Sequence, residues 1–134
     1  MAQSDPRWLA RLSSKIVALP VLAFAGAVLT DWAYAVSMTL QWSNFSGWLL
    51  LFGLVGGVTA LLVLALSVSA SGGGWVAVGL LAVGLLVEIA NFMIHMRDGY
   101  TAVVPIGMTL SIIGALVVAG AAWLTRAPVR EARS

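Results

Sequence analysis

Two acidic residues lie inside long apolar stretches of this sequence. Asp31 falls within the run 16–38, and Glu88 falls within the run 75–96. An ionised side chain inside a bilayer costs about 2.5 to 3.5 kcal/mol on insertion scales, so such a residue points first to a functional site. At 1.5 Å per residue, Asp31 lies roughly 22 Å and Glu88 roughly 20 Å from the start of its run. The two carboxyl groups are therefore expected at the same depth, in the outer leaflet.

More polar residues follow Glu88 at helical spacing. Asn91 and His95 come three and seven residues later, which places all three side chains on one helix face. No Lys or Arg lies within the apolar runs, so desolvation and mutual repulsion favour the neutral form of at least one acid. Two hydroxyl residues of the last run fall at a comparable level. The sequence predicts one intramembrane polar cluster: Asp31, Glu88, Asn91, His95, Thr109 and Ser111.

Four kinds of chemistry suit this cluster. It could relay protons, bind a divalent metal through Asp31, Glu88 and His95, or hold haem as a cofactor on His95. Haem would take its second ligand from a methionine, because His95 is the only histidine. The Glu-x-x-His repeat of diiron bundles is absent. The fourth reading is structural: the polar groups hydrogen-bond across helices and fix their packing, at about 0.6 to 2 kcal/mol per contact.

Several other functions are excluded by the sequence. It contains no cysteine, which removes thiolate metal sites, iron–sulfur clusters and disulfides. Nucleotide-binding, zinc-protease and serine-hydrolase motifs are absent, so we expect no catalytic residues and no enzyme. The few basic residues lie near the chain ends rather than clustered on one face, so no nucleic-acid partner is expected.

The elements that position the cluster are predicted from hydropathy. Of the 134 residues, 61% are hydrophobic and 9% are charged, compared with about a quarter charged in soluble domains. A spanning helix needs about 20 apolar residues. Segments 16–38, 47–68, 75–96 and 103–124 qualify, separated by short polar or glycine-rich turns. We predict an all-α, antiparallel bundle of four transmembrane helices over 16–124, with an N-terminal segment 1–15 and a C-terminal tail 125–134.

The orientation follows from the positive-inside rule. Basic residues precede the first span and follow the last, which predicts cytoplasmic N and C termini in a bacterial inner membrane. The same basic start and the triplet 33–35 (Ala-Tyr-Ala) also fit a signal peptide with its cleavage site. Asp31 just before that site and the length of the apolar run favour a retained helix instead.

Gly53 and Gly57 form a G-x-x-x-G motif in the second span. Small residues at this spacing let helices approach closely, so we expect a packing surface there. It could serve a homo-oligomer or a larger membrane complex as readily as the bundle itself.

Three segments resemble a bacterial family of small membrane proteins, the domain of unknown function 2231. They are 17–20 (Val-Ala-Leu-Pro) with Asp31; Gly47 and Trp48 with the Leu/Gly-rich helix; and 97–100 (Arg-Asp-Gly-Tyr) with Pro105, Gly107, Leu110 and Ser111. The chain departs from the family at Ala18, where the family has histidine, and at 124–127, where the family has a Gly-Gly-Glu-Leu-Val-Tyr ending. The resemblance implies a four-helix inner-membrane fold and no activity.

Two main functions follow from these observations. The first is a structural or accessory subunit of a membrane complex. The alternative is a haem-binding, metal-binding or proton-handling redox protein that uses the polar cluster. A transporter is a third class, although four helices leave little room for a substrate path unless the chain forms oligomers.

Overall fold

The computed structural model describes residues 7–97 and 103–131, and every regular element in these ranges is helical. The elements are α1 (Arg7–Ile16), α2 (Ala18–Ser37), α3 (Leu40–Ser71), α4 (Trp75–His95), η1 (Val103–Gly107) and α5 (Met108–Glu131). Four stretches are long and apolar enough to cross a membrane: Arg7–Ser37, Leu40–Ser71, Trp75–His95 and Val103–Arg126.

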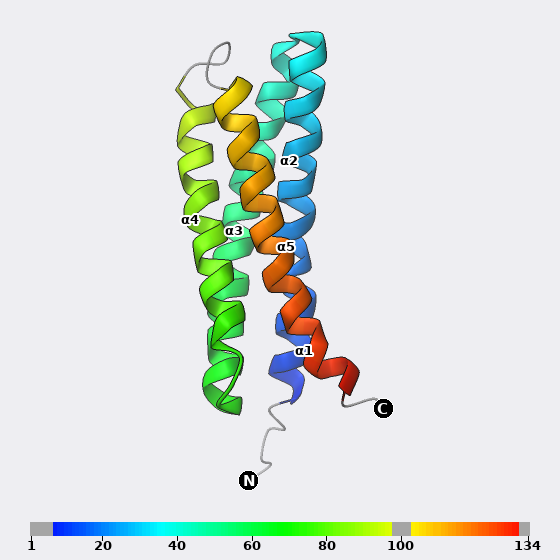
Figure 1. The fold of residues 1–134 in the computed structure, drawn as a ribbon, viewed down its shortest axis with the longest axis vertical. Helices are drawn as coiled ribbons and strands as arrows, with labels where there is room; N and C mark the ends of the chain where they lie inside the picture. The colour runs from blue at the N-terminus through cyan, green and yellow to red at the C-terminus, as the bar shows by residue number, and fades with distance from the viewer. Residues whose placement is uncertain (1–6, 98–102, 132–134) are drawn as a thin grey trace.

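The long helices lie side by side along the long axis of the molecule (Figure 1). Contacts run from α2 to α3, from α3 to α4, from α4 to α5 and from α5 back to α2, so the four helices close a ring around one core. The beginning of α1, the α3–α4 turn at Gly72 and the end of α5 lie at one end of this ring, and the end of α4 lies at the other. We call these the Gly72 end and the His95 end.

The first predicted span begins earlier than expected, because α1 and α2 are nearly continuous. Val17, between them, keeps helical dihedral angles (φ −64°, ψ −20°), and its N–H donates to the Ser13 carbonyl at 3.1 Å. Pro20 has no N–H to offer the Ile16 carbonyl four residues back, which accounts for the interruption at this point. Much of the segment that the sequence assigned to a separate N-terminal stretch is therefore helix.

The second predicted span also begins earlier. The polar residues Gln41, Ser43 and Asn44 fall between the predicted spans 16–38 and 47–68, where the sequence predicted a polar turn, but they lie in the first turns of α3. The chain turns instead at Met38, whose left-handed conformation (φ 53°) ends α2 while its N–H bonds to the Tyr34 carbonyl at 2.8 Å. Isolated polar residues lower helix propensity only slightly, so they do not end a helix whose backbone bonds are made.

The third span agrees closely with the sequence, and the fourth begins where expected, but its helix α5 continues to Glu131, so most of the predicted tail 125–134 is helix. Between α3 and α4 the chain turns through glycines, and Gly72 and Gly74 adopt positive φ values of 78° and 98° that glycine tolerates without strain. Before α5, Val104 is extended (φ −118°, ψ 125°) and the irregular segment η1 leads into the helix. The Asp98-Gly99-Tyr100 part of the family-like turn, Arg133 and the side chain of Arg130 lie outside the described residues.

Candidate functional site

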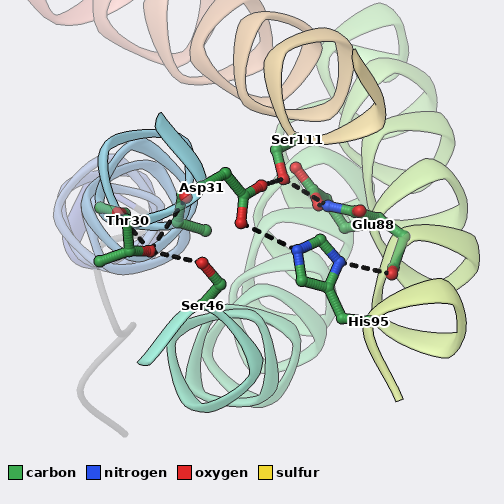
Figure 2. A network of polar contacts seen from close by, with 9 residues as sticks. Thr30, Asp31, Ser46, Glu88, His95 and Ser111 are labelled. Atoms are coloured by element: carbon green, nitrogen blue, oxygen red, sulfur yellow. Dashed lines mark hydrogen bonds and ion pairs between the residues drawn. The ribbon is translucent and has the colours of Figure 1, made fainter. Parts of the chain in front are cut away.

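Five buried polar residues from three helices meet near the His95 end of the ring. Asp31 comes from α2 and Ser111 from α5, and α4 supplies the other three (Figure 2). Asp31, Glu88, Asn91 and Ser111 are fully buried, and His95 is 8% exposed. We call these residues the polar network: Asp31, Glu88, Asn91, His95 and Ser111.

Asp31 and His95 form the central pair of the network. His95 Nε2 lies 2.9 Å from Asp31 Oδ1, and His95 Nδ1 lies 3.0 Å from the backbone oxygen of Asn91. A carbonyl oxygen only accepts hydrogen bonds, so Nδ1 must carry a proton. One further proton lies between Nε2 and Oδ1. The pair is therefore either imidazolium with carboxylate or neutral imidazole with carboxylic acid, and both forms have zero net charge.

Ser111 and Asn91 extend the network to the second acid. The Ser111 hydroxyl donates to Asp31 Oδ2 at 2.5 Å and accepts from Asn91 Nδ2 at 2.7 Å. Asn91 Nδ2 also donates to Glu88 Oε2 at 2.9 Å. An amide NH2 group donates two hydrogen bonds but does not give up a proton near neutral pH. Asn91 therefore couples Glu88 to the Asp31–His95 pair by orientation, without passing a proton between them.

No Lys or Arg side chain bonds to Glu88 in the described residues, and the neighbouring Asp31–His95 pair has no net charge to balance it. Arg97, the nearest Lys or Arg in the sequence, has an exposed side chain. Glu88 Oε1 and Asn91 Oδ1 are both buried acceptors without a donor in the described structure. A proton on Glu88 would convert one of these two acceptors into a donor and would leave the whole network uncharged.

The backbone of α5 makes room for the Glu88 side chain at Gly114. A Cβ atom built on Gly114 would overlap the Glu88 carboxyl group. Gly114 lies three residues after Ser111, so both face α4 from the same side of α5. The position of Glu88 thus depends on a missing side chain on the neighbouring helix.

Thr109, which the sequence placed in the cluster, does not join it. Its side chain is exposed, and its hydroxyl donates to the Pro105 carbonyl of its own helical segment at 2.7 Å. Residues two apart in a helix face different directions, so Thr109 and Ser111 cannot both point into the core.

The geometry gives little support to a metal or haem at this site. Among residues 7–97 and 103–131, no group of three or more His, Asp or Glu side chains is arranged to hold a metal ion. His95 already uses both ring nitrogens, so an iron ligand at Nε2 would have to displace Asp31. That displacement would leave a buried carboxylate without its main partner, at a cost of several kcal/mol.

The core becomes apolar immediately below the network. On each of the three helices, the residue seven positions from the network toward the Gly72 end is apolar and fully buried. These residues are Phe24 (from Asp31), Leu81 (from Glu88) and Val118 (from Ser111). Leu85 and Leu50 belong to the same apolar cluster. Fully buried apolar side chains therefore separate the network from the Gly72 end of the ring.

A second polar contact joins α2 to α3 and was not expected from sequence. The hydroxyls of Thr30 and Ser46 lie 2.6 Å apart, and Ser46 is fully buried (Figure 2). Ser46 lies close to the polar stretch that resembles a turn, which hides its role from sequence reasoning.

The structure places Gly53 and Gly57 against helices of the same chain. A Cβ atom on Gly53 would overlap Phe24 of α2, and one on Gly57 would overlap Leu85 of α4. Both glycines are buried, so this motif brings α2 and α4 close to α3 rather than presenting a free surface.

No family model matches the sequence, and the searches of curated proteins and of solved structures returned no match. The resemblance to the domain of unknown function 2231 therefore stays a prediction.

Proposed function

We propose that this chain spans a bilayer as an antiparallel four-helix bundle and reversibly binds protons at the polar network, from the side of the His95 end. The observation that carries the proposal is the Asp31–His95 pair, held at 2.9 Å in a fully buried site and linked through Ser111 and Asn91 to a second acid, Glu88. Intramembrane ionisable groups of this kind are commonly proton-binding sites.

The exposed surface supports placement in lipid. Large apolar side chains point outward from every long helix, with Leu22, Leu62, Leu86 and Leu116 each more than 60% exposed. Such a surface would be unfavourable in water and suits hydrocarbon. The positive-inside rule, applied to the basic residues at the Gly72 end, favours that end as cytoplasmic and the His95 end as external.

The network has two protonation states, which differ by the proton on Glu88. The Asp31–His95 pair is neutral in both of its proton arrangements, whereas Glu88 adds a full negative charge when ionised. Loss of one proton therefore leaves an unbalanced charge among fully buried groups that connect α2, α4 and α5. Because that charge is costly in a low-dielectric core, helix packing and proton binding depend on each other.

Infrared difference spectroscopy of the protein in lipid tests this function. We expect a protonated-carboxyl signal that changes reversibly between about pH 4 and pH 9, a range that includes the reference values of Glu and His. Glu88→Gln or Asp31→Asn should remove or shift that signal. Thr109→Val is the matched control, because Thr109 is exposed and outside the network.

The competing function, a structural or accessory subunit of a membrane complex, predicts a different result. If the network only fixes packing, the carboxyl signals will be the same throughout this pH range. That outcome would refute proton binding, and co-purification of the chain with larger partners would then support the accessory role.

A further inference from the structure

A pocket opens between the first turns of α3 and the last turns of α4, beside the polar network. Its volume is about 450 Å³, within the range of small-molecule sites. We propose that this α3/α4 pocket binds a neutral, membrane-soluble molecule with an aromatic or quinonoid ring and a hydrogen-bonding oxygen. This inference goes beyond proton binding and does not depend on it.

The floor of the pocket is polar. Ser43 and His95 line it, and each residue is only 8% exposed. Within the described ranges, the Ser43 hydroxyl makes no hydrogen bond, whereas both nitrogens of His95 are occupied. The Ser43 side chain lines the pocket and its hydroxyl has no partner in the protein, so it can donate to or accept from an occupant that brings a hydrogen-bonding group. A plain lipid chain would leave the hydroxyl unsatisfied.

The walls of the pocket are apolar and partly aromatic. Trp48 and Leu51 stand on the α3 side, and Phe92 and Met96 stand on the α4 side. Aromatic rings pack edge-to-face or offset against other rings, and a methionine thioether also contacts rings favourably. These walls suit a flat ring better than a branched or strongly hydrated molecule.

The lining of the pocket has no net charge, because its ionisable residue His95 is paired with Asp31. None of the described residues that line it is Lys, Arg, Asp or Glu. Asn44, at the rim, adds an amide that makes no hydrogen bond to any described residue and can meet a carbonyl or hydroxyl group. Because a buried charge without a partner is strongly disfavoured, the occupant is uncharged.

Gly47 allows the pocket to be filled selectively. It lines the pocket, and a Cβ atom built on it meets nothing within 4 Å. Gly47→Leu therefore starts its side chain in open space beside the pocket, and we expect the rest of the leucine to occupy part of that volume. Gly79→Leu is the matched control, because Gly79 also has open space around it but lies on α4 away from the pocket.

The test uses decylubiquinone, a short-chain benzoquinone, with the protein in lipid nanodiscs. Binding is followed by the NMR signals of the single histidine, which lines the pocket. We expect a saturable shift of these signals. Gly47→Leu should weaken binding by at least about tenfold, since overpacking a filled site costs about that much. Gly79→Leu should bind like the unmodified chain, and Ser43→Ala should bind several-fold more weakly.

Three results would overturn the proposal. The first is a non-saturable shift that is equal in all variants, which is partitioning into the bilayer. The second is equal saturable binding of decane, which would make the pocket a hydrocarbon groove. The third is unchanged affinity in Ser43→Ala. The histidine signals of Gly47→Leu without quinone must match those of the unmodified chain, which shows that the variant is folded. None of these results bears on the infrared test of proton binding.

Discussion

Replacement of Gly114 by alanine tests the packing of the acid most directly. The added methyl group would overlap the Glu88 carboxyl, which is held by Asn91 at 2.9 Å and cannot move aside without losing that bond. Overpacking costs about 1–3 kcal/mol, and the side-chain hydrogen bond that Asn91 donates to Glu88 within α4 adds about 0.5–1.5 kcal/mol. We therefore expect Gly114→Ala to lower the free energy of unfolding by roughly 2–4 kcal/mol.

A double-mutant cycle separates this effect from other consequences of the methyl group. In a Glu88→Ala background the carboxyl is gone, so Gly114→Ala should cost less than about 0.5 kcal/mol. Unfolding is measured by titration with SDS in mixed micelles, followed by tryptophan fluorescence. Gly120→Ala on the same helix is the control, because a Cβ there meets nothing within 4 Å and only helix propensity changes.

The reasoning fails if Gly114→Ala costs the same in both backgrounds. Equal costs would mean that the methyl group does not meet Glu88, and that the carboxyl lies elsewhere. A cost below about 0.5 kcal/mol in the unmodified chain would refute it as well.

Three further predictions concern other parts of the molecule. Ser46→Ala should lower stability by about 0.6–1.7 kcal/mol in the same SDS titration, because it removes the 2.6 Å contact with Thr30; an unchanged midpoint would refute that contact. Asp31→Asn should leave the single histidine neutral and protonated on Nδ1, as read from its ¹⁵N chemical shifts; protonation on Nε2 instead would contradict the bond to the backbone carbonyl. Because the chain has no cysteine, Thr39→Cys and Gly73→Cys each give one labelling site, just before and just after α3. An impermeant thiol reagent should reach them from opposite sides of the membrane, and labelling of both from one side would refute the crossing of α3.

The sequence was sufficient to predict the face of α4 that carries the site. Glu88, Asn91 and His95 share that face because of the helical period alone, and the structure buries all three. The partners of these residues on other helices could not be assigned in the same way. Whether Ser111 or Thr109 points inward depends on the rotation of α5, which packing against the neighbouring helices decides.

The start of α3 shows the limit of hydropathy. Gln41, Ser43 and Asn44 resemble a turn in composition, yet backbone hydrogen bonding continues through them. These first turns help to form the α3/α4 pocket. Its other lining residues lie on α4, more than 40 residues later, so no local sequence pattern brings the two sets together. Hydropathy along the sequence predicts where helices lie, whereas the position of a site between two helices also depends on how each helix is rotated about its axis.

The apolar layer beneath the network has a physiological consequence. Phe24, Leu81 and Val118 fill the centre of the ring seven residues below the buried acids. A charge that enters at the His95 end meets a barrier of hydrocarbon before it reaches the other face, and an isolated ion in such a medium is very costly. Under the proposed function, protons that bind from the His95 end would not cross to the Gly72 end, so the bundle would take up and release protons without conducting them through the membrane.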